Sequence, residues 1–200
     1  MKKHLIFCIA LVTAMVSCVE EPQIYRLLTD EEAAAVPYRM GESIKMLDQD
    51  GDTLCFTVVE DTTFVTHDFH GYYVLPNAKL HFKPQPYFYL REVVLQSRAE
   101  DSCRLRCGVA PGKVVSISYE MYDKFSGYNG NDYYWRIILS NVLPLGELPT
   151  TTFNLGDAHY ENVYKNEIDS QTGATSVCYY SEQFGLLTIK DGGNSLTLIP

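Results

Sequence analysis

After residue 37 the sequence consists of short runs of β-branched and aromatic residues, separated by turn-forming glycine, proline, asparagine and aspartate. The turns recur at roughly the 8–12-residue spacing that is typical of sandwiches and barrels built from short strands. We therefore expect an all-β domain, either an antiparallel β-sandwich or an up-and-down barrel or half-barrel. The expected strands are Ser43–Leu47, Thr53–Val59, Thr63–Thr66, Tyr72–Leu75, Lys79–Phe82, Phe88–Leu95, Cys103–Val109, Val114–Tyr122, Tyr133–Leu139, Asn162–Ile168, Val177–Tyr180, Gly185–Lys190 and Ser195–Ile199.

One short N-terminal helix is predicted before the first strand, over residues 29–35. Thr29 is placed to be its N-cap, and Glu32, three residues later, is placed to complete a capping box. Acidic residues fill the first turn, and Pro37 ends the helix.

Two loops resemble ligand motifs but are better explained as turns. The stretch DQDGDT (48–53) has its glycine at the wrong position for a calcium loop, and Asp-Gly between strands is typical of a hairpin. The stretch GVAPGK (108–113) is one residue short of a phosphate-binding loop, and Val114 stands where that loop needs serine or threonine.

His67, His70 and His81 lie in a region without helical pattern, so we expect surface histidines and no metal site or cofactor.

The first residues have the layout of an export signal. Lys2 and Lys3 are followed by an apolar stretch that is too short for a spanning helix, which needs about 20 apolar residues. The apolar stretch ends at Met15-Val16-Ser17-Cys18, which is similar to a bacterial lipobox, although Met15 replaces the usual leucine. We expect cleavage before Cys18 and attachment of lipid, including palmitate, to this cysteine; the alternative is a plain secreted protein. Stable anchoring needs at least two acyl chains, which a lipoprotein cysteine supplies.

The lipobox, the segment GESIKMLDQDGDTLCFTVVED and the ending SVCYYSEQFGLLTIKDGGNSLTLIP together resemble the small uncharacterised lipoproteins of gut Bacteroidota. The resemblance implies a cell-envelope location, in the outer membrane, and a β-rich fold. Glu20 and Glu21 are similar to the acidic tract that sends such lipoproteins to the cell surface. The resemblance supplies no catalytic residues.

Composition gives the domain organisation and excludes one class of partner. We expect a signal peptide at residues 1–17, a lipid-anchored tether at 18–28 and a single β-rich domain at 29–200. Loss of Lys2 and Lys3 with the signal changes the formal net charge from −9 to −11. An acidic chain without a basic cluster argues against binding to nucleic acid.

Four cysteines remain after cleavage and lipidation: Cys55, Cys103, Cys107 and Cys178. An oxidising compartment permits disulfides between them, and buried thiols are the alternative. Cys103 and Cys107 alternate with polar residues as on a strand, which would hold them roughly 13 Å apart, too far to bridge.

The stretch YDKFSGYNGNDYYW (122–135) is the most distinctive one for function. Aromatic residues flank a loop rich in glycine and asparagine, as in recognition loops, and core packing is the alternative. We expect Lys124–Asp132 to form an exposed loop in which Phe125, Tyr128, Asn129 and Asn131 contact a ligand.

No nucleophile–base pair or catalytic carboxylate pair stands out in the sequence, so we do not expect an enzyme. The expected function is a membrane-anchored, non-catalytic binding or accessory lipoprotein with a glycan or protein partner. The alternative is a lipocalin-like carrier that holds an apolar ligand inside the barrel.

Overall fold

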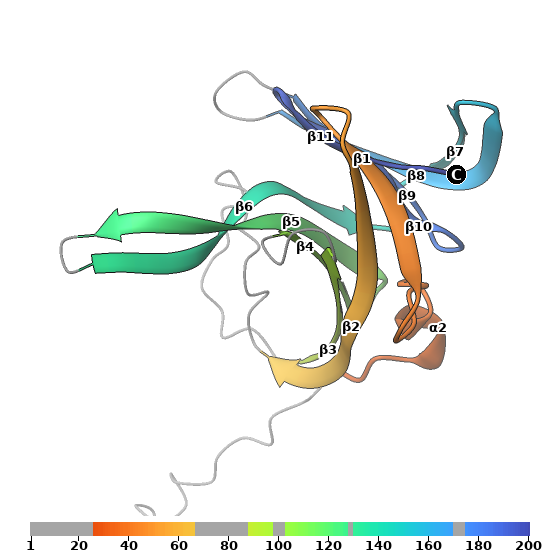
Figure 1. Cartoon of the computed structure of the whole chain (residues 1–200). Coiled ribbons are helices and arrows are strands. Elements are labelled where there is room, and N and C mark those ends of the chain that lie inside the picture. Colours follow the sequence, from red (N-terminus) through yellow and green to blue (C-terminus); the bar gives the residue numbers. More distant parts are fainter. Residues whose placement is uncertain (1–25, 67–87, 98–102, 128–129, 170–174) are drawn as a thin grey trace, which may run out of the picture.

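The computed structural model describes residues 26–66, 88–97, 103–127, 130–169 and 175–200. In these residues eleven strands form a single antiparallel sheet that curls into a half-barrel (Figure 1). The prediction of an all-β fold with one short helix is confirmed, and among the predicted architectures the half-barrel is the observed one. The elements are α2 Asp30–Ala33, β1 Ser43–Asp48, β2 Thr53–Thr66, β3 Phe88–Ser97, β4 Cys103–Ala110, β5 Val114–Gly127, β6 Gly130–Pro144, β7 Thr150–Leu155, β8 Ala158–Asp169, β9 Thr175–Ser181, β10 Gly185–Asp191 and β11 Asn194–Leu198.

The sheet consists of two meanders, one formed by strands β1 to β6 and the other by strands β7 to β11. The first strand of one meander, β1, pairs with the last strand of the other, β11, which joins the two into one sheet. The curl brings β6 against β8 and β10. The Asn166 side chain on β8 donates from Nδ2 to Asn141 Oδ1 at 2.9 Å and to the Val142 carbonyl at 2.8 Å, both on β6. These bonds tie the two meanders together.

The core lies between the two meanders. The alternation predicted for β4 is confirmed, because Cys103, Leu105, Cys107 and Val109 are all buried. Large side chains from both meanders fill the space between them, including Phe56 from β2 and Tyr180 from β9, which are both 0% exposed. Edge-to-face packing of Phe56 against Tyr119 adds a specific contact at a centroid distance of 6.3 Å.

The segment of residues 30–38, which we call the plug segment, covers part of this core. Its first half is α2, and the predicted capping box between Thr29 and Glu32 is present. In its second half, the side chains of Ala35, Val36 and Tyr38 are buried in the core. Tyr180 donates its hydroxyl hydrogen to the Ala35 carbonyl at 2.6 Å, and the backbone N–H of Leu186 donates to the Tyr38 hydroxyl at 2.8 Å.

Arg91 on β3 holds the same segment from another side. Its guanidinium donates to the carbonyls of Ala33 at 2.7 Å, Val36 at 2.8 Å and Tyr38 at 3.0 Å. It also makes two bonds of 2.9 Å to the Asp61 carboxylate. A planar guanidinium with five donors suits this task, because the end of a short helix leaves several carbonyls without partners.

The number of strands predicted over the described residues needs two corrections. Thr53–Val59 and Thr63–Thr66 belong to one strand, β2, because a register shift between Val58 and Glu60 lets pairing with β3 continue through the charged residues. The strand β7 was not predicted; it is an edge strand, and its exposed threonines lack the alternation of a half-buried strand. The predicted strands Tyr72–Leu75 and Lys79–Phe82, and the three histidines considered as metal ligands, lie outside the described residues.

Both loops interpreted as turns are turns. Asp48 accepts from the backbone N–H groups of Asp50 and Asp52 in the β1–β2 hairpin, with Gly51 in the left-handed region at φ +84°. Gly112 and Lys113 connect β4 to β5, and both have positive φ angles. Among the described residues, no helix combines the length and the apolar character needed to span a membrane.

Candidate functional site

A β-bulge in β8 creates the most distinctive site in the described structure. Thr151 and Phe153 of β7 pair with Val163 and Tyr160 of β8, so two residues of β8, Glu161 and Asn162, lie opposite one residue of β7. Bulges change the direction of side chains and are over-represented near functional sites. Asn162 has φ +54°, a left-handed conformation that asparagine tolerates better than most residues.

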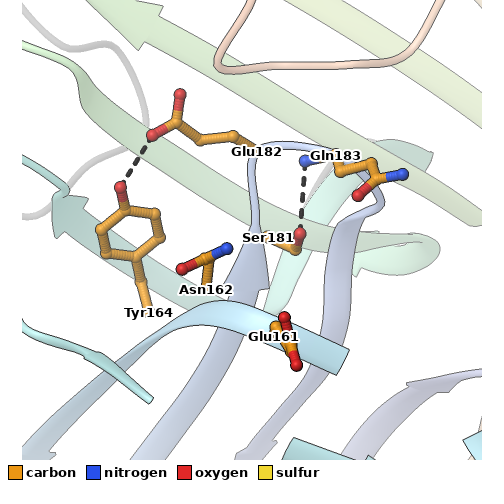
Figure 2. A pocket seen from close by; sticks show the side chains of 6 residues that line it. All are labelled: Glu161, Asn162, Tyr164, Ser181, Glu182 and Gln183. Atoms are coloured by element: carbon orange, nitrogen blue, oxygen red, sulfur yellow. Dashed lines mark hydrogen bonds between the residues drawn. The ribbon is translucent and has the colours of Figure 1, made fainter. Parts of the chain in front are cut away.

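The end of β9 meets this bulge. Val163 pairs with Ser181, the last residue of β9, and a turn then leads into β10 at Gly185. A hollow of about 270 Å³ lies between the bulge and the turn (Figure 2). The residues that line it are Glu161, Asn162, Tyr164, Ser181, Glu182 and Gln183.

Glu182 is held in place from two sides. The Tyr164 hydroxyl donates to Glu182 Oε1 at 2.7 Å, as Figure 2 shows, and Lys113 Nζ lies 3.2 Å from Glu182 Oε2. Lys113 also contacts Glu31 Oε1 at 3.0 Å, so the β4–β5 turn and the plug segment both support the site. The Ser181 hydroxyl oxygen accepts from the backbone N–H of Gln183 at 3.2 Å, which orders the turn.

The protonation states of these groups follow from their contacts. Burial and the hydrogen bond to Glu182 raise the pKa of Tyr164, which therefore remains a hydrogen-bond donor at neutral pH. The contacts with Glu31 and Glu182 raise the pKa of Lys113, which remains a cation. The Lys113 ammonium therefore balances the charge of Glu182.

The chemistry of the hollow is that of hydrogen bonding. Its side chains offer carboxylate acceptors, carboxamide groups that both donate and accept, and hydroxyls. Across the described part of the chain, no three His, Cys, Asp or Glu side chains come close enough together to hold a metal ion. These groups can form hydrogen bonds with a polar ligand.

A second polar cluster lies on the face of β3, β4 and β5 that points away from the core. Arg104 pairs with Glu120, and Arg106 lies 3.3 Å from Glu92 and 3.7 Å from Glu120. Ser118 donates to Glu120 at 3.0 Å. Burial raises the pKa of Glu92, and the neighbouring Arg106 opposes this effect. Because these charges pair with one another across adjacent strands, we interpret the cluster as structural.

The predicted ligand loop has a different conformation from the one expected. Strands β5 and β6 continue to Gly127 and Gly130, with Phe125 paired to Asp132 and Ser126 paired to Asn131. The prediction of a loop over Lys124–Asp132 is therefore wrong, because strand pairing continues to Gly127 and Gly130. Tyr128 and Asn129, which lie between these two strands in the sequence, are outside the described residues.

The paired ends of β5 and β6 instead form an arm. Cys103 at the start of β4 pairs with Met121, so from Tyr122 onward β5 pairs only with β6 among the described strands. Figure 1 shows these ends projecting from the body of the sheet. Six residues, Tyr122–Gly127, span about 20 Å in extended form. Tyr122, at the base of this arm, is 43% exposed.

None of the four cysteines of the domain, Cys55, Cys103, Cys107 and Cys178, forms a disulfide in the structure. Cys103, Cys107 and Cys178 are buried, and Cys55 is half-buried. Cys103 and Cys107 both lie on β4, as predicted, and do not bridge each other. Burial raises the pKa values of Cys107 and Cys178 far above the ordinary value, so both remain protonated. Cys18, the predicted lipid attachment site, lies outside the described residues.

Sequence reasoning did not find the hollow at the β8 bulge. Its residues come from the middle of β8 and from a turn about twenty positions later. One local signal was present: Tyr160-Glu161-Asn162-Val163 places two polar residues between apolar ones, which breaks strand alternation and indicates a bulge.

No protein-family model matches the chain, and neither a curated protein nor a solved structure is significantly similar to it. The fold and the site therefore define the class by themselves: a curled β half-barrel with a filled core, a projecting two-stranded arm and a small polar hollow at a bulge.

Proposed function

We propose that this protein is a membrane-anchored, non-catalytic binding lipoprotein of the bacterial cell envelope. The lipobox at Met15–Cys18 and the basic and apolar residues before it support the anchor. The likeness of the leader and of the domain segments to lipoproteins of gut Bacteroidota favours the outer membrane. The acidic pair Glu20-Glu21 favours its outer face.

The filled core is the main observation in favour of binding at the protein surface. It argues against transport of an apolar ligand inside the half-barrel. The centre of the described fold is occupied by large side chains with 0% exposure, among them Met46, Phe56 and Tyr180. A lipocalin-like carrier needs an apolar interior cavity, typically of about 300–1,000 Å³. The hollow of the described structure is instead polar and lies at a bulge of the sheet.

The arrangement of reactive groups favours a non-catalytic role. A catalytic cysteine needs an accessible thiol with a lowered pKa, whereas burial raises the pKa values of Cys107 and Cys178. The polar hollow contains carboxylates, but Glu182 is engaged by Tyr164 and Lys113. These contacts suit a fixed hydrogen-bonding group better than a proton-transfer group.

The arm is the second element that supports a binding function. A two-stranded ribbon without a third strand is only marginally stable unless it packs on something, which makes it suited to contact a partner. Its sequence carries Tyr122, Phe125, Tyr133, Tyr134 and Trp135. We infer a glycan or protein partner for this arm, with Phe125, Tyr128, Asn129 and Asn131 as the contacting residues.

Lipidation can be tested in a bacterial host that matures lipoproteins. The native chain should incorporate labelled palmitate and fractionate with the outer membrane, and Cys18→Ser should abolish both. Cys55→Ser is the matched control, since it removes a half-buried thiol of the domain and should leave labelling unchanged. A Cys18→Ser protein that still fractionates with membranes at mature size would refute the anchor.

Binding and transport can be separated with a fluorescent fatty-acid probe. The mature protein in mild detergent should show no saturable uptake of the probe, because its core is filled. Saturable binding of one probe per chain would refute the binding-module proposal in favour of the carrier.

Protease treatment of intact cells tests surface exposure, since a surface lipoprotein is degraded and an inward-facing one is protected.

A further inference from the structure

We propose that the hollow at the β8 bulge is a binding site for one neutral sugar ring. This inference rests on the proposed binding function and adds the place and the class of ligand. It concerns residues that are separate from the β5–β6 arm.

The lining of the hollow matches the hydrogen bonding of a polyhydroxylated ligand. Each sugar hydroxyl is both a donor and an acceptor, so it is best met by a mixture of both kinds of group. Glu161 and Glu182 supply acceptors, and the carboxamides of Asn162 and Gln183 supply both donors and acceptors. Hydrogen bonds to carboxylates are stronger than those between neutral groups.

The lining of the hollow argues against three other classes of ligand: anions, metal ions and apolar molecules. None of the six lining residues is basic, and the neighbouring Lys113 is already paired with Glu182 and Glu31, so the lining carboxylates would repel an anion. The described residues do not provide the cluster of three ligating side chains that would indicate a metal site. Every lining residue carries a polar group, and the Tyr164 ring is the one aromatic surface among the six, so an apolar ligand would leave most of these groups unpaired.

The hollow is already arranged for a ligand. Tyr164 and Lys113 fix the Glu182 carboxylate, which keeps acceptor capacity beyond these two contacts. Asn162 is held by the bulge in a left-handed conformation, and Figure 2 shows its side chain between Tyr164 and Ser181. A binding site with fixed groups loses less conformational entropy when the ligand binds.

An exposed aromatic residue follows the lining residues in the same turn. Phe184 comes directly after Gln183 and is 42% exposed. Tyr160, which precedes the bulge, packs edge-to-face against it at a centroid distance of 5.1 Å and an angle of 84°. Phe184 does not line the hollow, but it lies in the turn that carries Glu182 and Gln183, so a sugar that extends out of the hollow along this turn can contact its ring.

The size of the hollow limits the ligand. About 270 Å³ lies just below the range of about 300–1,000 Å³ for pockets that enclose drug-sized molecules. A single ring at the end of a glycan fits this space better than several enclosed rings do.

Ligand-observed NMR on the full mature lipoprotein in detergent provides the test. The probes are glucose, galactose, mannose and N-acetylglucosamine as neutral rings, glucosamine as a cationic ring and glucuronate as an anionic ring. At least one neutral ring should bind, and glucuronate should not.

Two substitutions remove ligand contacts with little disturbance of the fold. Asn162→Gly removes the carboxamide but tolerates the positive φ angle. Phe184→Ala removes the exposed ring. Each should weaken binding of the neutral sugar at least tenfold. The matched controls, Glu147→Gln in the β6–β7 turn and Phe64→Ala on β2, should leave binding within twofold.

Three results would overturn the inference. The first is binding of glucosamine alone, which would show a cation site. The second is sugar binding that neither Asn162→Gly nor Phe184→Ala weakens, which would place glycan recognition elsewhere and leave the proposed function intact. The third is absence of binding by every neutral ring to the folded protein. The proposed function fails separately, if the anchor and fatty-acid experiments give the contrary results described above.

Discussion

Replacement of Gly185 by alanine should destabilise the protein more than an ordinary glycine substitution. Gly185 is buried at the start of β10 and has φ +77°. A Cβ atom at this position would lie 2.2 Å from the hydroxyl oxygen of Tyr38 and 2.3 Å from its Cζ. The same hydroxyl accepts the hydrogen bond from the Leu186 N–H. Tyr38 cannot move away from the new methyl group without losing that bond.

Three costs combine in this substitution. A left-handed conformation costs alanine about 1–2 kcal/mol. Overpacking of a filled core costs about 1–3 kcal/mol. If Tyr38 moves instead, the buried Leu186 N–H loses its partner, at about 1–3 kcal/mol. Because the last two costs are alternatives in part, we expect a total of about 2–5 kcal/mol, a large share of the roughly 5–15 kcal/mol that stabilises a typical domain.

Gly41→Ala is the matched control. Gly41 has φ +81°, and a Cβ atom there would meet nothing within 4 Å, so this variant carries the backbone cost alone. Equilibrium urea unfolding of the mature protein, followed by far-UV circular dichroism, gives both free energies of unfolding. Gly185→Ala should cost at least about 1 kcal/mol more than Gly41→Ala. Equal costs would refute the packing of Tyr38 against β10.

Three further predictions concern the plug segment and the arm. Arg91→Lys keeps the charge but cannot satisfy three carbonyls and Asp61 together, so urea unfolding should show a loss of about 1–3 kcal/mol; an unchanged free energy would contradict the role of the guanidinium. Hydrogen bonds from the backbone N–H groups of Thr29 and Gly112 lower the pKa of Glu32 below 4.5 in the folded state. The folded state therefore binds fewer protons than the unfolded state, and this stabilisation is present above about pH 4.5 and lost as pH falls through the folded pKa. Glu32→Gln should lose less stability than the native protein between about pH 5 and pH 3, and identical acid profiles would show that the carboxylate contributes nothing. Replacing both Phe125 and Tyr128 by alanine should change stability by less than about 0.5 kcal/mol and abolish binding in a glycan-array screen; a large loss of stability would show that both side chains are packed in the core.

Local sequence patterns predicted a helix or strand correctly where a single strong pattern was present. Thr29 and Glu32 predicted the capping box, because both partners lie within one turn of helix. The alternation of Cys103 to Val109 predicted a strand with a buried face, since a period of two fits only an extended chain. The boundaries of the β5–β6 arm were predicted less well. Glycine and asparagine indicated a long loop, whereas pairing between the strands continues to Gly127 and Gly130.

The all-β class, the short capped helix and the turns at Gly51 and Gly112 can be predicted from sequence, because each depends on residues close together in the chain. The choice between sandwich and half-barrel cannot, since it depends on the pairing of β1 with β11, which are separated by most of the domain. The polar hollow is also a tertiary feature. It exists because a bulge in β8 lies beside the end of β9, while Lys113 reaches Glu182 from a distant turn. Strand periodicity shows which residues share a face, but it does not show which strands become neighbours.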